Sequence, residues 1–412
     1  MIQTLCITCK LINFLFWTGY AKIFYTRTDF FKDLFLRLHH FNLIIVKILQ
    51  CSANNDDLWS NENKELLKMY TDNVPYNYDD IDYHAINELM MDKQIIFNDF
   101  KKPLHSGTIS IVYDGIYLDK KVIIKIKRKN IEDRLNKNNE EFKNMLFLLR
   151  WLPYVNKLQF EDKYNIYKPL LETQCNFKNE IKNQELYRKN FKNYDLVKIP
   201  VIYNDRCTEN SIVMEYVNGL NICDIKDTDK NIYMDIVGHV MIYSQLIYGF
   251  FHCDAHSGNI LFIKNNDIHQ VCLIDFGICG MYNIKELNNY YDIFSNIGIN
   301  NYHEVTKQFL TNFTNCPSNH EDYDLIFKEA KKLLYESFEI KKEFSFSEIY
   351  MLYSILKEYG IYTNESWIKT ELAIASIDGC MKELKTNNIG LTDILKQKIN
   401  KLNELENSEL LN

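Results

Sequence analysis

Residues 249–280 read GFFHCDAHSGNILFIKNNDIHQVCLIDFGICG, and this stretch decides which fold the chain adopts. It contains the pattern H-x-D-x-x-x-x-N at 252–259 and the tripeptide D-F-G at 275–277. Residues 259–263 and 271–274 are short apolar runs with the composition of β-strands, and a polar turn separates them. The sequence therefore predicts a polar loop, a two-stranded hairpin and an acidic turn, in this order.

The polar residues of this stretch are those that phosphoryl transfer from ATP requires. Protein oxygens hold a divalent metal ion against the phosphates, and a further carboxylate lies near the incoming hydroxyl group or water. Asp254 and Asn259 in one loop, followed across a hairpin by Asp275, supply these groups. A D-F-G tripeptide alone recurs by chance, and a polar turn between two buried strands is the alternative. The order and spacing of the whole set favour a kinase-like site for ATP and Mg²⁺.

Upstream of this stretch, the hydrophobic period changes to that of β-strands. The runs 109–113, 115–118 and 121–127 are rich in β-branched and aromatic residues. The dipeptides Asp114-Gly115 and Asp119-Lys120 separate these runs and are expected to form turns. The sequence thus predicts a small β-sheet ahead of the catalytic motifs.

Lys125 stands within the last of these runs, in the sequence VIIKIK. Because an isoleucine lies on either side, its ammonium group should point to the opposite face, where it could pair with ATP phosphates. A solvent-facing position on an edge strand is the alternative for Lys121 and Lys127, and it applies less to Lys125. Glu180 is the expected partner of Lys125, and Glu185 is the competing candidate.

Residues in front of the first strand are candidates for binding the nucleotide. Small side chains there allow backbone amides to approach phosphate oxygens, although only one of these residues is glycine. The candidates are Leu104, Ser106, Gly107 and Thr108, with Val112 on the strand that follows. The hexapeptide MEYVNG at 214–219 predicts a hinge, where backbone groups of Glu215 and Val217 could meet an adenine edge. A strand end followed by an ordinary turn is the alternative for the hexapeptide.

Most of the remaining chain is predicted to be helical. Apolar residues recur at near-helical spacing in 28–100, where a short helix is expected over 83–91, and again in 131–195. A long apolar helix over 235–251 should lead into the polar loop. Residues 284–405 are expected to be helical and to contribute no further chemistry.

The composition is that of an ordinary globular protein. The chain has 412 residues, of which 46% are hydrophobic and 25% charged, enough for one large or two to three ordinary domains. A formal net charge of −7 provides no basic field that would favour nucleic acid. The eleven cysteines are scattered, and the single C-x-x-C at 6–9 has no second pair beside it. We expect a reducing intracellular compartment and no zinc site.

The N-terminal segment allows two interpretations. The first 28 residues contain no acidic residue, and residues 11–25 are mostly apolar and aromatic. This run is too short and too interrupted for a secure membrane span, and it has no small-residue cleavage site. It is either a targeting or membrane-surface helix or, as we favour, the first packed helix of the domain. A cytosolic and a mitochondrial or membrane-associated location both stay open.

These motifs resemble those of the ABC1/UbiB/ADCK family of atypical, protein-kinase-like proteins, over about residues 42–384. GFFHCDAHSGNILF is similar to the family's G-F-F-H-A-D-P-H-P-G-N segment, VCLIDFGICG to its L-D-F-G-x-x-G, and IVMEYVNG to its hinge. IIVKILQCSANNDDLW with the later DNVP is similar to an N-terminal K-x-G-Q region that ordinary protein kinases lack. PLHSGTISIVYDG occupies the place of the alanine-rich loop that replaces their glycine-rich loop.

The resemblance implies a role for each matched residue. Lys125 would anchor the phosphates and pair with Glu180, and Asp254 would be the catalytic-loop carboxylate. Asn259 and Asp275 would ligate Mg²⁺. Members of the family are associated with coenzyme Q and related prenyl-lipid metabolism at membranes. They behave more like ATPases or small-molecule kinases than like protein kinases.

The N-terminal region both matches the family and departs from it. Lys47 and Gln50 would lie on a helix folded over the active site, where they would block protein substrates. Leu49 replaces the glycine of K-x-G-Q, which puts close approach of that helix in doubt. Residues 105–107 are His, Ser and Gly in the alanine-rich loop, which changes the expected nucleotide fit. Residues 174–176 are Gln-Cys-Asn where the family carries E-x-D, so a polar lock to Lys47 would be weakened.

Together these observations predict an α+β, bilobal protein-kinase-like fold. It should combine a small β-rich N-lobe, a large helical C-lobe and a helical N-terminal extension. The predicted segments are an apolar helical N-terminus at 1–37, the K-x-G-Q-type extension at 38–100, the N-lobe at 101–216 with a helical insert at 131–195, and the C-lobe at 217–412.

The expected activity is Mg-dependent ATP binding and slow phosphoryl transfer to water or to a small or lipid-like acceptor. Peripheral membrane association and a link to prenyl-quinone metabolism follow from the resemblance. One alternative is a nucleotide-binding scaffold without turnover, which the Gln174 and Asn176 replacements favour. The other is an ordinary protein kinase, which the K-x-x-Q helix and the lack of an A-P-E segment after Gly280 disfavour.

Overall fold

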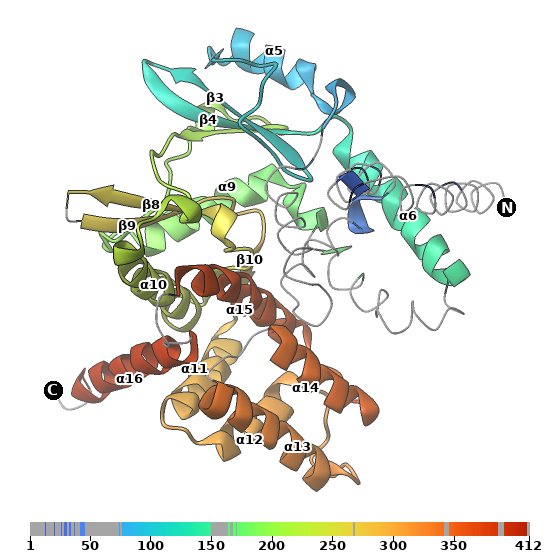
Figure 1. Ribbon diagram of the computed structural model, residues 1–412, viewed down its shortest axis with the longest axis vertical. Helices are drawn as coiled ribbons and strands as arrows, with labels where there is room; N and C mark the ends of the chain where they lie inside the picture. The colour runs from blue at the N-terminus through green and yellow to red at the C-terminus, as the bar shows by residue number, and fades with distance from the viewer. Residues whose placement is uncertain are drawn as a thin grey trace. The chain divides into compact units, whose positions relative to one another are not determined.

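The structure is a computed structural model that describes residues 76–149, 171–266, 268–341, 346–385 and 391–409, with a few isolated positions outside these ranges. The described residues divide into two compact units, which are taken separately below, and Figure 1 labels their helices and strands. The first unit falls within Met1–Ile181 and Val201–Tyr216, and the second within Lys182–Pro200 and Val217–Asn412. Lys47, Gln50 and most of residues 1–75 lie outside the described residues, and this range covers the predicted segment 1–37 and the first part of the predicted extension 38–100.

An antiparallel sheet forms the centre of the first unit. Its strands are β1 (Ile96–Phe97), β2 (His105–Ser106), β3 (Ser110–Tyr117), β4 (Lys120–Lys127) and β6 (Ser211–Glu215). The strand order is β1-β3-β4-β6, and β2 pairs with β3 beside β1. β4 therefore has a strand on each side, and Lys125 lies on a central strand.

The turn expected at Asp114-Gly115 is wrong, because β3 continues through both residues. Gly115 pairs with Phe97 of β1 and with Val122 of β4, and a Cβ atom there would overlap the carbonyl oxygen of Ile96. Glycine is thus required by the close approach of β1 and not by a turn. The chain reverses at 118–119 instead, where both residues have positive φ (46° and 60°), as in the tight turns that suit twisted hairpins.

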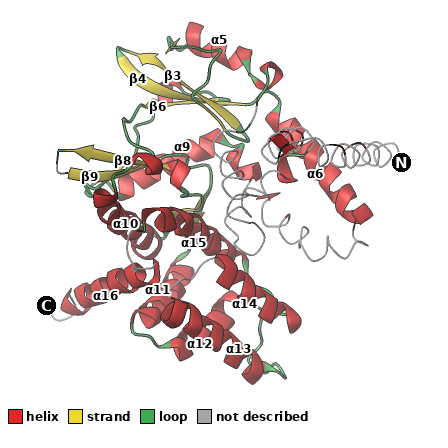
Figure 2. Cartoon of the chain, in the orientation of Figure 1, coloured by secondary structure: helices red, strands yellow, loops and turns green. Residues whose placement is uncertain are grey.

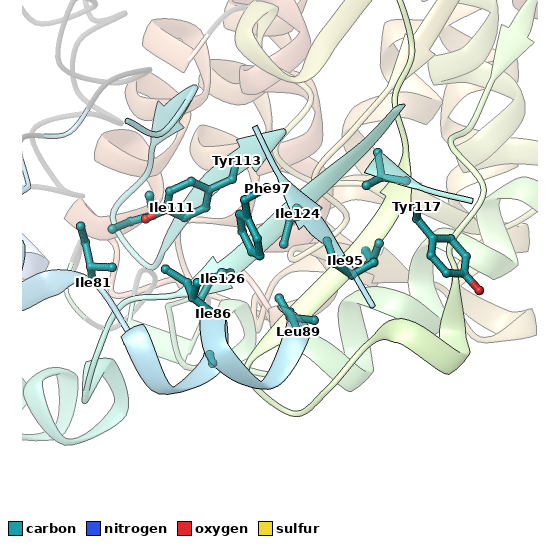
Figure 3. Close-up of a cluster of buried hydrophobic side chains, with 13 residues drawn as sticks. Ile81, Ile86, Leu89, Ile95, Phe97, Ile111, Tyr113, Tyr117, Ile124 and Ile126 are labelled. Atoms are coloured by element: carbon teal, nitrogen blue, oxygen red, sulfur yellow. The ribbon is translucent and has the colours of Figure 1, made fainter. Parts of the chain in front are cut away.

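One face of this sheet packs against α5 (Tyr83–Met91), a helix that the sequence predicted with these bounds. Asp82 caps the helix by accepting hydrogen bonds from two backbone N–H groups of its first turn. Figure 3 shows Ile86 and Leu89 of α5 pointing toward Ile124 and Ile126 of β4, within one buried apolar cluster. Residues 86 and 89 are one helical turn apart, which explains why both reach the sheet.

The opposite face of the sheet is covered by the start of α9 (Phe177–Asn190). Phe177 packs there with Ile212 and Met214 of β6. The unit boundary divides α9, so that residues 177–181 belong to the first unit and the remainder to the second. The first unit also contains α6 (Ile131–Leu149) and a 3₁₀ turn at Tyr78–Asp80.

The second unit contains two small sheets. β5 (Val197–Lys198) pairs in parallel with β9 (Ile268–Leu273), which pairs antiparallel with β8 (Ile260–Asn265). β8 and β9 form the hairpin that the sequence predicted between the two polar motifs. β7 (Phe250–His252) pairs with β10 (Cys279–Met281), so the chain enters the polar loop and leaves the D-F-G turn side by side.

The helix predicted over 235–251 has different bounds. α10 spans Asp227–Ile242, a π-helical turn follows at Tyr243–Ile247, and residues 250–252 belong to β7. Gly249 has φ of 58°, in the left-handed region, and the chain leaves the helical conformation there. The carbonyl oxygen of Gly249 accepts a hydrogen bond from the N–H of Tyr282 at 2.8 Å. The apolar run misled the prediction because β7 is buried as well, so its residues are equally hydrophobic.

Helices make up the rest of the second unit (Figure 2). They are α11 (Ile284–Gly298), α12 (Tyr302–Phe313), α13 (Tyr323–Tyr335), a π-helical turn (Glu336–Lys341), α14 (Phe346–Glu358), α15 (Glu365–Leu384) and α16 (Leu391–Glu409). α16 packs on α10 and α11, where Gly238 and Gly298 allow close contact with its side chains. Among the described residues, no helix combines the length and the hydropathy needed to cross a bilayer.

Candidate nucleotide site

Lys125 and Glu180 form a buried ion pair in the first unit. Lys125 Nζ lies 2.7 Å from Glu180 Oε1, and the two side chains are 10% and 1% exposed. The pair lies on the sheet face opposite α5, because Lys125 alternates along β4 with Ile124 and Ile126, which face α5. Of the two glutamates considered from the sequence, the structure brings Glu180 to the lysine.

Glu185 and Lys127 occupy different surroundings. Glu185 is exposed, five residues further along α9. Lys127 lies on the same face as Lys125, and its side chain is only 6% exposed, with Nζ 2.7 Å from Glu132 Oε1. Lys127 is therefore not a solvent-facing residue of an edge strand, because β4 is central and Phe177 covers this face. The ring of Phe177 lies within 6 Å of both ammonium groups, at a cation–π distance.

The predicted nucleotide loop is a tight hairpin in the first unit. Its backbone is closed by two hydrogen bonds of 2.8 Å, from Leu104 N–H to Val112 O and from Gly107 N–H to Ser110 O. Ser106 is fully buried, so its hydroxyl group points into the unit and not toward solvent. A phosphate at this loop would therefore meet the backbone at the tip and not the serine side chain.

Arg128 holds the same loop from inside. Its side chain is buried, and its Nε donates to Gly107 O at 2.9 Å while Nη2 donates to Ser106 Oγ at 2.8 Å. Nη1 donates to Asp80 Oδ2 at 2.9 Å. Thr108, at the hairpin tip, stays partly exposed. The loop is thus tied at its base and open at its tip.

The charge of Arg128 persists despite its burial. Burial lowers the pKa of Arg128 to about 10, whereas the neighbouring Asp80 carboxylate raises it, so the guanidinium is charged at neutral pH. Asp80 also pairs with Arg134 at 3.0 Å. Sequence reasoning missed Arg128, because no spacing rule separates it from its exposed neighbour Lys129 in a basic run.

The two hinge positions fall on either side of the unit boundary. Glu215 ends β6, and its N–H donates to Val201 O at 2.8 Å, while its carboxylate accepts the N–H of Val201 at 3.1 Å. Because that N–H is engaged, the carbonyl of Glu215 is the group suited to an adenine amine. Val217 begins the second unit.

In the second unit, His252 fixes the backbone of Asp254. His252 is buried, its Nδ1 accepts the N–H of Asp254 at 3.0 Å, and its Nε2 lies 3.2 Å from Ile274 O. These contacts together require a neutral imidazole with its proton on Nε2. Burial lowers the pKa of His252, which agrees with the neutral form.

Asn259 closes the loop from its other end. Its Nδ2 donates to Asp254 O at 2.8 Å and lies 3.2 Å from His256 Nε2. Since the amide nitrogen is used within the loop, a metal ion would be bound by the amide oxygen Oδ1. The hydrogen bond also ties the candidate catalytic carboxylate and the candidate metal ligand into one rigid turn.

Asp275 has an unusual backbone conformation. Its φ is 61°, in the left-handed region, where a non-glycine residue costs about 1–2 kcal/mol. Such residues gather at functional sites, where the surrounding structure holds them. Here the anchor is Phe276, which is fully buried, packs 5.2 Å from the ring of Tyr187 and accepts a hydrogen bond from Asn183 Nδ2 at 3.0 Å. Asp275 itself remains half-buried.

The donor chemistry of Asn259 and Asp275 fits a magnesium ion that a nucleotide brings with it. Mg²⁺ is usually held by one or two protein oxygens, with phosphates and water completing its octahedron. Ile274 N–H donates to Asn259 O at 3.0 Å, so the backbone just before Asp275 is hydrogen-bonded to the other candidate ligand. In the part of the chain that the structure describes, no three His, Cys, Asp or Glu side chains form a metal cluster.

A comparison with known families identifies the protein class. The model of the ABC1 atypical kinase-like domain matches residues 69–309, more than half of the chain. The chain belongs to this family. The resemblance and the α+β, protein-kinase-like fold predicted from the sequence are therefore confirmed. The matched region includes every candidate site residue except Lys47 and Gln50.

Individual relatives of this ABC1 chain are distant. It is 32% identical over 232 residues to an uncharacterized protein in the hydrogenase 1 5′ region of Clostridium pasteurianum, covering 53% of this chain and 42% of that protein. It is 24% identical over 369 residues to the probable protein kinase UbiB of Shewanella baltica, covering 86% and 66%. The chain thus spans less than two thirds of the length of both relatives.

Among solved structures, the chain is similar to that of Rv3197 with erythromycin from Mycobacterium tuberculosis. The two are 13% identical, the TM-score is 0.45, and the match covers 84% of this chain and 91% of the other.

Proposed function

We propose that this ABC1 protein binds Mg-ATP and transfers the γ-phosphoryl group to water or to a small or lipid-like acceptor. The observation that carries the proposal is the hydrogen bond from Asn259 Nδ2 to Asp254 O. It holds a half-buried carboxylate and an amide oxygen donor in one loop, next to an Asp275 whose backbone is held in a strained conformation. This is the donor set that phosphoryl transfer requires.

In this proposal, each unit contributes its own groups. In the first unit, Lys125 neutralises phosphate charge, and Glu180 keeps the ammonium group in place. In the second unit, Asp254 orients the acceptor hydroxyl group or water, and it can accept the proton that the acceptor loses. Asn259 and Asp275 would hold Mg²⁺, which when bound offsets the negative charge on the phosphate oxygens.

The nature of the acceptor rests on the family alone. Prenyl-quinone metabolism, with peripheral membrane association, is the setting that the ABC1 resemblance implies. A small or lipid-like acceptor is proposed on that ground.

A nucleotide-binding scaffold is the second candidate, and the segment 174–176 favours it. Gln174 and Asn176 stand where the family resemblance places acidic residues. In the structure, Asn176 Oδ1 accepts the N–H of Asn179 at 3.1 Å, as a helix-capping residue does at the start of α9. Asn176 therefore caps the helix without carrying a charge. The scaffold predicts stabilisation by ATP without phosphate release.

The test is phosphate release from ATP with Mg²⁺, measured for the wild type, Asp254→Asn and Asp275→Asn. Asp292→Asn, at an exposed position of α11, is the matched control. We expect release by the wild type and the control, and its loss in both site variants. Anionic lipid vesicles added in parallel should stimulate release if the acceptor lies at a membrane. Undiminished release by Asp275→Asn would contradict the assignment, and ATP-dependent thermal stabilisation without any release would favour the scaffold.

A further inference from the structure

α15 lies beyond the region that the family model matches, yet it lines the loop that carries Asp254. Three hydrogen bonds join the loop to this helix, and the loop donates in each: Cys253 Sγ to Lys369 O at 3.6 Å, Ala255 N–H to Ser376 Oγ at 3.0 Å, and Ser257 Oγ to Glu383 Oε1 at 3.4 Å. The three acceptors are seven residues apart and so lie on one face of the helix. The donors are alternate residues of the loop.

The central contact is the best defined of the three. Ala255 is buried, so its N–H group would be left without a partner if Ser376 lacked its hydroxyl group. The hydroxyl of Ser376 donates to Ala373 O at 3.1 Å, within its own helix. That bond fixes the hydroxyl proton, and the lone pairs of the oxygen are then directed at the N–H of Ala255.

This contact completes the support of Asp254. The peptide before Asp254 is held through its N–H, which donates to His252 Nδ1. The peptide after it is held twice, at its carbonyl oxygen by Asn259 Nδ2 and at its N–H by Ser376 Oγ. Because both flanking peptide planes are fixed, the direction of the Asp254 side chain is restricted. Ser376 supplies the one of these three bonds that comes from outside the loop.

The loop sequence indicates why such support is needed here. In the family segment that the loop resembles, proline stands at the positions of Ala255 and Ser257. Proline fixes φ near −65° and has no N–H group, so a loop with two prolines is stiff by itself. In this chain both positions are freer, and both hydrogen-bond to α15.

We infer that Ser376 is a positioning residue that aims the Asp254 carboxylate through the N–H of Ala255. Ser376 acts on the loop backbone and contacts no substrate. The inference rests on the proposed function for its effect on rate, whereas its effect on the loop can be measured without turnover.

Loss of the Ser376 hydroxyl group should change kcat and leave KM for ATP alone. Asp254 orients the acceptor and is not needed to bind the nucleotide, so the KM of Ser376→Ala should stay within about twofold of the wild type. A misplacement of the carboxylate by a fraction of an ångström to 1 Å should lower kcat by about 10–100-fold. The amide of Ala255 should exchange with solvent faster, because its partner is gone.

The experiment compares the full chain with Ser376→Ala, Ser376→Thr and Ser337→Ala. Threonine keeps a hydroxyl group at 376. Ser337 is a matched control, because it is fully buried in the same unit and its Oγ donates to Leu333 O at 2.8 Å, away from the loop. The readouts are kcat and KM for phosphate release, thermal midpoint, and hydrogen exchange of a peptide spanning 252–259.

We expect Ser376→Ala alone to lower kcat and to speed exchange in 252–259, with activity and protection regained in Ser376→Thr. Unchanged exchange and kcat in Ser376→Ala would overturn the inference. An equal loss of kcat in Ser337→Ala, together with a lower thermal midpoint, would also overturn the inference, because the loss of kcat would then come from general destabilisation. If the wild type releases no phosphate, the proposed function fails, and faster exchange in Ser376→Ala would still support the role of Ser376 in the loop.

Discussion

The two units hold their candidate site residues by different means. In the first unit, they are held by ion pairs between buried side chains. These are the Lys125–Glu180 pair and the Arg128–Asp80 pair, whose four side chains have little or no exposure. In the second unit, the two peptide groups that flank Asp254 are held by neutral groups, namely an imidazole, an amide and a serine hydroxyl. A buried ion pair is costly to break on one side, whereas a single neutral hydrogen bond is not.

Because of this difference, substitutions in the two units should affect stability and activity to different extents. Substitutions in the buried ion pairs of the first unit should destabilise the fold before they reveal a role in catalysis. Substitutions in the loop of the second unit should remove activity from a protein that remains folded. The loop is therefore the better place to test function, and the lysine strand the better place to test stability.

The largest expected effect is on the buried pair. Glu180→Ala removes the carboxylate that lies 2.7 Å from the buried Lys125 ammonium group, and the free energy of unfolding should fall by about 3–5 kcal/mol. Glu185→Ala, on the exposed side of the same helix, is the control and should change it by no more than about 0.5 kcal/mol. Urea denaturation of both variants makes the comparison. Similar small losses in the two would show that the pair is not what holds this region.

Next in size is a pH effect from a carboxyl group in the second unit. Glu371 of α15 is buried and accepts a hydrogen bond from Tyr353 Oη of α14, and burial raises the pKa of Glu371 to about 7. Between about pH 4.5 and 7 the unfolded chain has lost this proton and the folded chain keeps it. Stability from this group is therefore complete below pH 4.5 and is lost as the pH rises through 7, by about 3 kcal/mol.

The measurement is the free energy of unfolding at pH 5 and pH 8 for the wild type and for Glu371→Gln. The glutamine keeps an oxygen acceptor for Tyr353 but has no proton to lose, so its difference between the two pH values should be smaller by that amount. An unchanged difference would mean that Glu371 is ionised in the folded protein, and the second unit would then contain a buried charge like the first.

A smaller stability effect is expected in the loop. Asn259→Ala removes the hydrogen bond to Asp254 O and the proposed metal ligand, so phosphate release should fall by about 100-fold. The free energy of unfolding should fall by only about 1 kcal/mol, the usual size for one neutral hydrogen bond. Phosphate-release assays measure the loss of activity, and urea denaturation of the same variant measures the loss of stability. A loss of stability as large as that of Glu180→Ala would remove the distinction between the units.

The smallest effect is expected from the second lysine of β4. Lys127 pairs with Glu132 at the same distance as Lys125 with Glu180, but Glu132 is 61% exposed. Water can replace an exposed carboxylate, so Glu132→Ala should lower the free energy of unfolding by less than about 1 kcal/mol. Urea denaturation of Glu132→Ala, beside Glu180→Ala and the wild type, measures this change in the free energy of unfolding. A cost near that of Glu180→Ala would show that the burial of the lysine alone sets the penalty.

Much of the site could be predicted because its signals are local. The loop at 252–259, the hairpin that follows and the inward lysine on β4 each depend on residues within one or two elements. The pairing partner Glu180 was also reached from the sequence, because a helix upstream of the hinge had few suitable glutamates. Alternation and motif spacing are short-range properties, and the fold preserves them.

The misses have a common cause in long-range contact. Gly115 was expected in a turn, but a glycine is required there because β1 approaches it closely. β1 is too far away in the sequence for residues near 115 to indicate this contact. Arg128 looks like one more residue of a basic run, and Ser376 like one more small residue of a helix. The hydrogen bond of Ser376 spans 121 residues of sequence. Helical periodicity predicts that a face is buried, but it does not identify what that face covers.

The contacts between α15 and the loop also bear on how this gene can change over evolutionary time. They join residues 253–257, which lie inside the family match at 69–309, to residues 369–383, which lie beyond its end. Substitutions in the two segments are expected to be linked, since a proline at 255 has no N–H group and would remove the need for an acceptor at 376. A recombination point between 309 and 365 would transfer every recognisable motif and separate the loop from its partner helix. Descendants of such an exchange could keep the family's signature and still differ in how fast they turn over.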